Sequence, residues 1–382
     1  MKGERGRGKG EGIKTRVRGV RALFLCLCLY PLTFSLSQAA PRGGAWERQK
    51  TGTFAWLHAV FFVDERRGWA AGGKGALLST ADGGATWESR RRPTEDSLRD
   101  VFFHDAGAGW LLCERGAFMP MAEGESVSYL LKTADGGGSW SRVEVTRGAD
   151  ADLKLAGVRF ADRERGWVYG EMGALFATAD GGRTWSRQRV PTRHLLLGAS
   201  FFDARTGWLS GGGLTVLKTS DGGASWHPGT VFLPESGAEG QRQPEPRAAE
   251  PGPGARHDAT ARRLSRRLNA VWFADTGRGW AVGSGGVILS TADGGRTWRP
   301  QASGVGDDLS DVKFFDAREG WAVGSGGAML HTTDGGRTWA DARRVTTHAL
   351  ERISLVGRRA WAVGFGGTVV ALKGDGGGTS DE

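Results

Sequence analysis

Short apolar runs separated by turns rich in glycine and aspartate recur along the chain. In one unit the runs are DVKFF (311–315), GWAVG (320–324), GAMLHT (327–332) and RTWAD (337–341), each about five residues long. Runs of this length between turn residues are typical of β-strands. No stretch of 12 residues with the apolar spacing of a helix occurs within a unit. The pattern therefore predicts four short antiparallel strands per unit.

The unit is repeated seven times. Each copy carries a tryptophan after a small residue, and the commonest distance from one such tryptophan to the next is 41 residues. That distance is in the range of four-stranded propeller blades. We therefore predict an all-β fold in residues 40–378, a seven-bladed β-propeller of four-stranded antiparallel blades, with a tail at 379–382. The repeated tryptophans are Trp69, Trp110, Trp167, Trp208, Trp280, Trp321 and Trp361.

The two ends of the repeat complement each other. The distance from Trp46 to the first strand of the first unit equals the distance from the closing tryptophan of a regular unit to the first strand of the next unit. Yet no unit precedes Trp46. The last unit, which contains Trp361, reaches a Gly-Asp-Gly turn at 374–376 and has no closing tryptophan. We predict that residues 43–49 form the outer strand of the last blade and close the ring.

A second motif, seen as STADGGRTW at 290–298, closes six of the units. Its glycines permit positive φ, and its aspartate can accept backbone N–H groups across its own turn. A calcium loop would need several oxygen ligands in the same segment. We therefore expect a structural turn and neither a metal nor a catalytic site. Of the 16 tryptophans, only Trp56 and Trp272 lie outside both motifs. The aspartates of the second motif are Asp82, Asp135, Asp180, Asp221, Asp293 and Asp334.

The motif S/T-x-D-G-G-x-T/S-W is the Asp-box (BNR) repeat, which sialidases, other glycosidases and non-catalytic propellers share. With V-x-F-x-D-x-x-x-G-W-A-V-G-x-G-G before each box, residues 43–378 resemble the photosystem II stability/assembly factor family of propellers. The resemblance implies a lumenal or periplasmic protein that binds a partner polypeptide and helps to assemble a membrane complex. It also implies an arginine patch that contacts the partner.

In a propeller with strands a to d, the Asp boxes and the a–b turns share one rim, so we expect functional loops on the opposite rim. Arginines near the ends of the outer strands collect on that opposite rim and can pair with carboxylates or phosphates. Ordinary solvated charge is the alternative interpretation. The candidates for partner contact are Arg92, Arg142, Arg187, Arg189, Arg193, Arg299, Arg343 and Arg344.

Two insertions interrupt the regular spacing on the same rim. Residues 113–129 extend a loop of the second unit and include Met119 and Met121. Residues 229–267 are rich in Pro, Gly and Arg with few apolar side chains, so we expect this insertion to be disordered. Both insertions could grip a partner or could be tolerated surface excursions.

The net charge of +9 is concentrated at the N-terminus. Residues 1–39 carry eight Lys and Arg against two Glu, with an apolar run at 22–36 and a small-residue site at Ser37-Gln38-Ala39. This arrangement predicts a signal peptide over residues 1–39 and export to the periplasm or beyond the cell. An uncleaved anchor is the alternative, but the run is shorter than the roughly 20 residues of a spanning helix. Behind the leader only Cys113 remains, so no internal disulfide is expected.

An enzymatic interpretation has little support in the residues. A sialidase-like centre needs an activated tyrosine, and behind the leader the chain contains only Tyr129 and Tyr169. In each regular unit a glycine comes three residues after the repeated tryptophan, and Tyr169-Gly170-Glu171 is the one place where an acidic residue follows that glycine. We expect a monomeric, non-enzymatic protein that binds another protein without cofactor, metal or nucleic acid. The alternative is a secreted glycan-binding or glycoside-hydrolase propeller.

Overall fold

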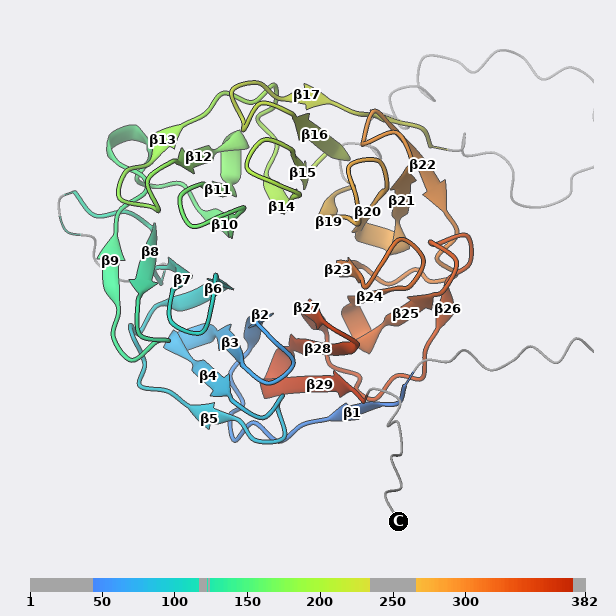
Figure 1. Ribbon diagram of the computed structural model, residues 1–382, viewed down its shortest axis with the longest axis horizontal. Helices are drawn as coiled ribbons and strands as arrows, with labels where there is room; N and C mark the ends of the chain where they lie inside the picture. The colour runs from blue at the N-terminus through green and yellow to red at the C-terminus, as the bar shows by residue number, and fades with distance from the viewer. Residues whose placement is uncertain (1–43, 117–121, 123, 234–265, 374–382) are drawn as a thin grey trace, which may run out of the picture. The chain divides into compact units, whose positions relative to one another are not determined.

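Seven β-sheets surround a central axis in the computed structural model of the chain (Figure 1). The structure describes residues 44–116, 122, 124–233 and 266–373. The predicted signal peptide, Met119 and Met121, most of the 229–267 insertion and the 379–382 tail lie outside these ranges. None of the helices within them is long and apolar enough to cross a membrane.

Each of the first four sheets is one blade, with its first strand innermost and its last strand outermost (Figure 1). Blade 1 holds β2 (Leu57–Phe62), β3 (Gly68–Gly72), β4 (Leu77–Thr80) and β5 (Glu88–Ser89), and blade 2 holds β6 (Ser97–Phe103), β7 (Gly109–Glu114), β8 (Ser128–Thr133) and β9 (Ser141–Val143). Blade 3 holds β10 (Leu155–Phe160), β11 (Gly166–Gly170), β12 (Leu175–Thr178) and β13 (Ser186–Arg187), and blade 4 holds β14 (Leu196–Phe201), β15 (Gly207–Gly211), β16 (Thr215–Thr219) and β17 (His227–Pro228).

The remaining three sheets complete the ring. Blade 5 holds β18 (Thr230–Val231), β19 (Leu268–Phe273), β20 (Gly279–Gly283), β21 (Ile288–Thr291) and β22 (Thr297–Gln301). Blade 6 holds β23 (Leu309–Phe314), β24 (Gly320–Gly324), β25 (Met329–Thr332) and β26 (Ala340–Asp341), and blade 7 holds β27 (Leu350–Val356), β28 (Arg359–Gly364), β29 (Thr368–Leu372) and β1 (Trp46–Arg48). Short 3₁₀ turns occur at η1 (Gly73–Gly75), η2 (Gly148–Asp150), η3 (Glu171–Gly173), η4 (Ser284–Gly286), η5 (Ser325–Gly327) and η6 (Phe365–Gly367).

The N-terminal strand closes the ring as predicted. β1 pairs antiparallel with β29, with Trp46 opposite Leu372 and Arg48 opposite Val370. The backbone N–H of Gln49 extends the pairing by donating to the Val369 carbonyl at 2.8 Å. Blade 7 is therefore built from both ends of the propeller, and this pairing covers the outer edge of β29.

Adjacent blades pack on each other through stacked aromatic rings. Trp69 of blade 1 lies parallel to Phe103 of blade 2, with ring centroids 3.6 Å apart, and Phe103 meets the box residue Trp140 edge-on. Such pairs add about 0.5–1.5 kcal/mol to the burial of their area. The buried apolar residues accordingly form seven clusters in the described chain, each shared by two neighbouring blades. Parallel stacks of this kind are also formed by Trp110 and Phe160, Trp167 and Phe201, Trp208 and Phe273, Trp280 and Phe314, and Trp361 and Phe62.

Three glutamines add a hydrogen bond between blades that the sequence did not reveal. Each lies three residues after a closing tryptophan and accepts the indole N–H of the closing tryptophan in the next blade. The pairs are Gln49 with Trp87 at 2.9 Å, Gln188 with Trp226 at 3.4 Å and Gln301 with Trp339 at 3.1 Å.

The turns divide between two rims. On one, which we call the box rim, the N–H of Gly83 in an Asp box donates to the carbonyl of Arg66 in an a–b turn at 2.7 Å. On the other, which we call the loop rim, the N–H of Gly75 in a b–c turn donates to the carbonyl of Asp96 in the connection to the next blade at 2.8 Å.

Two details of the predicted strands need correction. Blade 5 has a fifth strand, because β18 pairs in parallel with β22, with Val231 opposite Trp298. The start of the 229–267 insertion thus belongs to the sheet, where Val231 buries its side chain in the same cluster as Trp298. In blade 2, β7 continues to Glu114 and β8 begins at Ser128, so both ends of the predicted 113–129 loop are strand.

Replacement of Trp46 tests the ring closure. Its side chain is 6% exposed and packs in the cluster between blades 6 and 7. We expect Trp46→Ala to destabilise the protein by about 3–5 kcal/mol, the usual cost of removing a buried tryptophan, and deletion of residues 43–49 to lower the melting temperature further. Denaturant unfolding measures the change. Trp56→Ala is the control, because Trp56 is 44% exposed, and an equal effect of both substitutions would contradict the closure.

Candidate protein-binding surface

The Asp-box carboxylates are occupied by their own turns. In the first box, Asp82 accepts hydrogen bonds from the Thr86 hydroxyl at 2.6 Å, the Thr86 N–H at 2.9 Å and the Thr80 hydroxyl at 2.8 Å. The hydrogen bond from the Thr86 hydroxyl is the main cause that lowers the pKa of Asp82 to about 2. Within the described ranges no group of three or more His, Cys, Asp or Glu is placed to hold a metal ion. The same hydroxyl and N–H bonds recur at Asp135, Asp180, Asp221, Asp293 and Asp334.

The predicted arginines do not form one patch. They lie on or after the outer strands of five blades, from Arg92 after blade 1 to Arg344 after blade 6. Carboxylates pair with half of them: Arg92 with Glu95 at 3.4 Å, Arg142 with Glu144 at 2.5 Å, Arg187 with Asp150, and Arg344 with Asp307 at 2.8 Å.

The other four arginines have no carboxylate partner among the described residues. The guanidinium of Arg299 lies over the ring of Phe232, 5.4 Å from its centroid. Arg189 and Arg193 follow β13, and Arg343 follows β26. The blade 3 segment carries three of the predicted arginines within seven residues, Arg187, Arg189 and Arg193, and the adjacent pair Arg343 and Arg344 follows β26.

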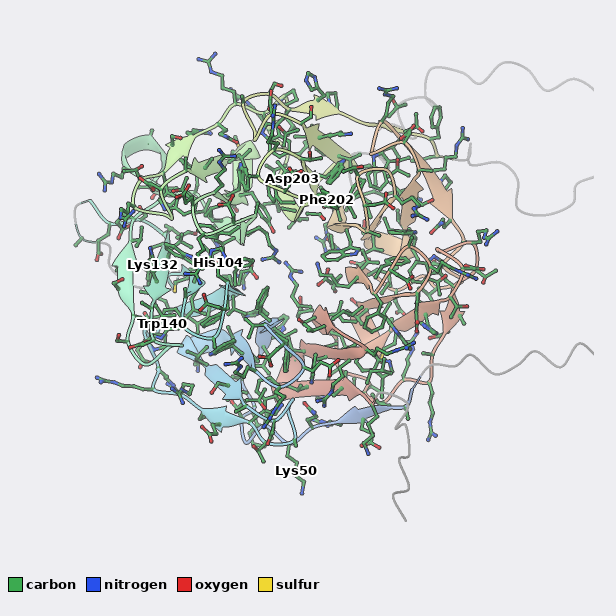
Figure 2. All side chains as sticks on the ribbon, in the orientation of Figure 1. Lys50, His104, Lys132, Trp140, Phe202 and Asp203 are labelled. Carbon is green, nitrogen blue, oxygen red and sulfur yellow. The ribbon has the colours of Figure 1, made fainter. Side chains whose placement is uncertain are left out.

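Exposed apolar side chains mark the loop rim more clearly than the arginines do. The described residues include seven exposed large hydrophobic side chains, and five of these belong to the loop rim: Phe54, Trp56, Met172, Leu195 and Phe365. Phe202 lies instead in an a–b turn of the box rim, near the central axis (Figure 2), and Phe232 follows β18 at the outer edge of blade 5. The loop rim is thus the apolar face of the propeller.

Two of these side chains, Trp56 and Phe365, form what we call the aromatic cluster, and Phe54 lies two residues before Trp56 in the same connection. Trp56 and Phe365 meet edge-on with ring centroids 5.5 Å apart, although they come from opposite ends of the propeller sequence. The segment of Phe54 packs on the Phe365–Gly367 turn, where the Gly367 N–H donates to the Ala55 carbonyl at 2.8 Å. The Trp56 indole N–H donates to Glu351 at 3.2 Å, which fixes the ring at the seam between blades 7 and 1.

Basic groups border the aromatic cluster on the inner strands. His58 lies next to Trp56, with ring centroids 5.4 Å apart. Burial, reinforced by the charges of Arg99 and Arg352, lowers the pKa of His58 to about 4, so the imidazole is neutral at pH 7. Glu114 offsets Arg99 at 3.1 Å. Arg352 has no carboxylate within ion-pair distance in the described chain, and its charge is therefore available near the cluster.

Buried carboxylates link the innermost strands of neighbouring blades. Asp100 of β6 accepts from the Val158 N–H at 2.9 Å and from the Arg159 guanidinium at 2.6 Å, both in blade 3. Asp311 occupies the same position in blade 6 and accepts from the Ile353 N–H of blade 7 at 3.1 Å. These carboxylates act as bridges between blades, because each is satisfied by backbone donors of its neighbour.

Met172 shows local backbone strain on the loop rim. It occupies the left-handed region with φ 57° in η3, as Lys74 does with φ 54° in η1, whereas three corresponding turns use Gly285, Gly326 and Gly366. A non-glycine residue there costs on the order of 1 kcal/mol. Met172 is nevertheless 55% exposed, so its side chain does not repay that cost by packing inside the protein.

The candidate enzymatic residues are engaged in structure. Tyr169 is 1% exposed, and its ring packs over Gly157, where a Cβ atom would lie 2.2 Å from the tyrosine hydroxyl. Glu171 accepts the backbone N–H of Lys154 at 3.1 Å. Burial raises the pKa of Tyr169, which disfavours the phenolate that a nucleophilic tyrosine needs.

Trp56 is the functional candidate that the arginine-based expectation missed. The sequence did carry a signal for it, since Trp56 and Trp272 are the two tryptophans outside the repeated motifs. The structure puts both in unusual settings: Trp56 on the exposed loop rim, and Trp272 on the innermost strand of blade 5 with the ammonium of Lys313 over its ring at 4.4 Å.

One family model matches more than half of the chain. It is described as photosynthesis system II assembly factor YCF48, and it matches residues 91–193, 261–347 and 301–380. No curated protein matches the chain.

Solved propeller structures match over a larger part of the chain. A structure of YCF48 bound to D1 peptide has 20% identity, covers 86% of this chain and 97% of its own, and gives a TM-score of 0.63. YCF48 from Cyanidioschyzon merolae also has 20% identity, with coverages of 86% and 98% and a TM-score of 0.61. The GH74 xyloglucanase from Xanthomonas campestris has 15% identity and a TM-score of 0.58, and the match covers 86% of this chain but 54% of the xyloglucanase. At these identities the likeness is one of fold.

Acid titration tests the role of the box carboxylates. The pKa of Asp82 is lowered in the folded state, so the ionised carboxylate stabilises the fold. This stabilisation is complete at a pH above the pKa of the unfolded state, about 4, and is lost as the pH falls through the folded-state pKa of about 2. We expect the melting temperature to fall over this range, and Asp82→Asn to reduce both the stability at pH 5 and the size of that fall. Thermal unfolding from pH 5 to pH 2 measures both. Asp152→Asn, in an exposed connection, should leave the pH dependence unchanged; a wild-type profile for Asp82→Asn would contradict the turn role.

Proposed function

This chain belongs to the photosynthesis system II assembly factor YCF48 family, and from that membership we propose that it is an exported, non-enzymatic propeller that binds a segment of a partner polypeptide. The partner is a subunit of a membrane complex, and binding stabilises that subunit during assembly. The observation that carries the proposal is the gathering of exposed apolar side chains on the loop rim, five of the seven in the described chain.

A complex of a structurally similar propeller supports a polypeptide as the ligand. In that complex YCF48 is bound to D1 peptide, and the family model covers both halves of this chain. An exposed aromatic cluster beside basic groups suits a peptide with apolar side chains and carboxylates. The rings supply most of the contact area, and the cations supply specificity and a faster association.

We place the peptide site over the aromatic cluster and the neighbouring end of β27. Trp56 is held by its hydrogen bond to Glu351 and needs little ordering on binding. Arg352 offers a cation beside it. Met172 adds an exposed, adaptable apolar side chain elsewhere on the same rim.

Several features favour binding over catalysis. Tyr169 is buried, Glu171 is engaged by a backbone N–H, and the Asp-box carboxylates serve their own turns. A retaining glycosidase would need two carboxyl groups about 5–5.5 Å apart on either side of the substrate. The proposal of export rests on the basic and apolar leader, and on a mature chain with one cysteine, Cys113, which is buried.

Substitutions in the aromatic cluster test the peptide site. We expect Trp56→Ala combined with Phe365→Ala to weaken binding of a fluorescent D1 peptide by about tenfold or more, because central aromatic residues dominate such interfaces. Fluorescence polarisation gives the dissociation constant. Phe232→Ala is the matched control, since Phe232 is 47% exposed but lies at the outer edge of blade 5. Equal affinity of the double variant and wild type would exclude the cluster as the site.

A second set of variants tests the predicted arginine patch. We expect that simultaneous replacement of Arg187, Arg189 and Arg193 by alanine reduces the amount of partner captured from envelope extract. Most of the loss should come from Arg189 and Arg193, because Arg187 is already paired with Asp150. Quantitative pull-down compares the triple variant, the Arg189/Arg193 double variant and wild type. Unchanged capture by the triple variant would remove these arginines from the interface.

A further inference from the structure

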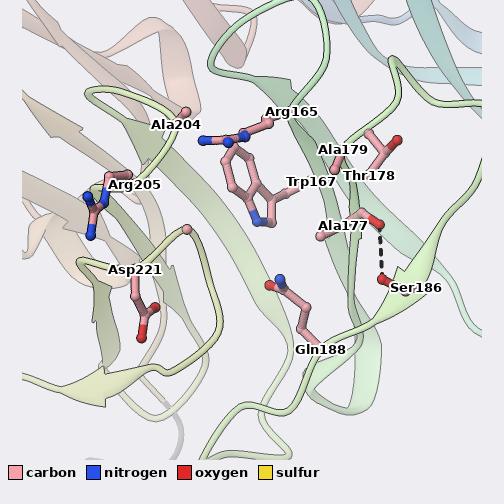
Figure 3. A pocket seen from close by; sticks show the side chains of 11 residues that line it. Arg165, Trp167, Ala177, Thr178, Ala179, Ser186, Gln188, Ala204, Arg205 and Asp221 are labelled. Atoms are coloured by element: carbon pink, nitrogen blue, oxygen red, sulfur yellow. Dashed lines mark hydrogen bonds between the residues drawn. The ribbon is translucent and has the colours of Figure 1, made fainter.

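A groove lies on the box rim at one seam between two blades. It lies between blades 3 and 4, has a volume of about 470 Å³ and is bordered by Trp167, Ala177 and Gln188 from blade 3 and by Arg205 and Asp221 from blade 4 (Figure 3). This volume is within the range of small-molecule sites. The groove is on the opposite rim from the aromatic cluster, so the inference does not rest on the proposed function.

The floor of the groove holds an unpaired donor. In four other seams the indole N–H of the repeated tryptophan donates to a box glycine of the next blade, as Trp208 does to the Gly294 carbonyl at 2.9 Å. Trp167 is 1% exposed, yet its indole N–H has no partner in the described chain. Figure 3 shows that nitrogen turned toward the space between Gln188 and the Asp221 turn. An unpaired buried N–H is costly, so a ligand that accepts from it gains affinity.

Arg165 also differs from its counterparts. In blades 1 and 5 the arginine two residues before the tryptophan pairs with the aspartate of its own turn, Arg67 with Asp64 at 2.7 Å and Arg278 with Asp275 at 2.8 Å. Arg165 makes no ion pair within the described residues and lines the groove together with Trp167 (Figure 3). Arg205 of blade 4 also borders the groove.

A small residue opens the groove. The residue opposite the tryptophan is Lys132 in blade 2, and its ammonium crosses the seam to the Gly181 carbonyl at 2.9 Å. Blade 4 likewise has Lys218 opposite Trp208. In blade 3 this residue is Ala177, which does not reach across the seam. Blades 1, 5 and 7 also have small residues at this position, Ser79, Ser290 and Ala371. In blade 7 the guanidinium of Arg359 crosses the seam instead and donates to the Gly83 carbonyl at 3.0 Å.

The groove offers donors and few free acceptors. Asp221 accepts from Ser225 and Thr219 in its own box. Gln188 uses its side-chain oxygen to accept the Trp226 indole N–H, which leaves its amide nitrogen free to donate. The Arg165 guanidinium, an indole N–H and an amide N–H remain, with Arg205 at the border, beside an indole face and alanine side chains.

We propose that this groove is a binding site for a carboxylate group. A planar carboxylate accepts two parallel hydrogen bonds from a guanidinium, and its remaining lone pairs can accept from the Trp167 and Gln188 donors. The carboxylate comes either from a free dicarboxylic acid or from an acidic side chain on the surface of a partner polypeptide. Both sources present the same chemistry to the groove.

The indole N–H of Trp167 gives a direct readout. We expect its ¹H–¹⁵N resonance, assigned as the peak lost in Trp167→Phe, to shift on titration with glutarate or with a blocked tripeptide carrying one glutamate. Saturation by glutarate indicates a free acid as the source, and saturation by the tripeptide alone indicates a partner side chain. Glutaramide, which lacks the charge, should leave the resonance in place. No shift with either carboxylate at millimolar concentration would overturn the proposal.

Variants of the groove provide the control. We expect Arg165→Gln with Arg205→Gln to weaken binding by about tenfold or more, the usual effect of losing charged hydrogen bonds. Arg67→Gln and Arg278→Gln remove the equivalent paired arginines and should leave the affinity unchanged. Ala177→Lys copies blades 2 and 4, fills the seam and should abolish the shift while the protein stays folded. Equal weakening by the Arg67 or Arg278 variants, or full binding by Ala177→Lys, would refute the assignment.

Discussion

The stack of a tryptophan from one blade on an aromatic ring of the next is the interaction on which the rest of the structure depends. A four-stranded blade alone leaves both faces exposed, and only its neighbours can cover them. Trp69 on Phe103, and the equivalent stacks around the ring, bury these faces pair by pair. Because every blade needs two neighbours, the ring must close. The short strand around Trp46 is therefore as important to the core as any strand inside a repeat.

This repetition also decides where function can lie. Residues that recur in every unit are used by the scaffold: the tryptophans stack, and aspartates such as Asp82 hold their turns. What is left for binding is the set of residues that break the pattern. Trp56 and Phe365 break it on the loop rim by exposing aromatic rings. On the box rim, Arg165 breaks it because, within the described residues, it lacks the ion pair that Arg67 and Arg278 make with their own turns.

Charge follows the same division between scaffold and surface. Asp100 and Asp311 are buried and join neighbouring blades through backbone donors. Arg142, Arg187 and other outer arginines are offset by nearby carboxylates, which weakens their field at a distance. Among the described residues, the cations without such partners include Arg352 on β27 and Arg165 in the groove. These two are thus better suited to an external anion than the paired outer arginines.

The sequence by itself determined the fold, the number of blades and the closing strand, because the spacing of apolar and turn residues is local and repeats in register. Only the tertiary structure decided the sites. It paired outer arginines with carboxylates, brought Trp56 to Phe365 from the other end of the propeller, and added β18 to blade 5. It also left the indole N–H groups of Trp167 and Trp321 without the partner that four other seams of the described chain supply. Such contacts depend on which side chains from neighbouring blades meet across a seam, and spacing along one chain does not contain that information.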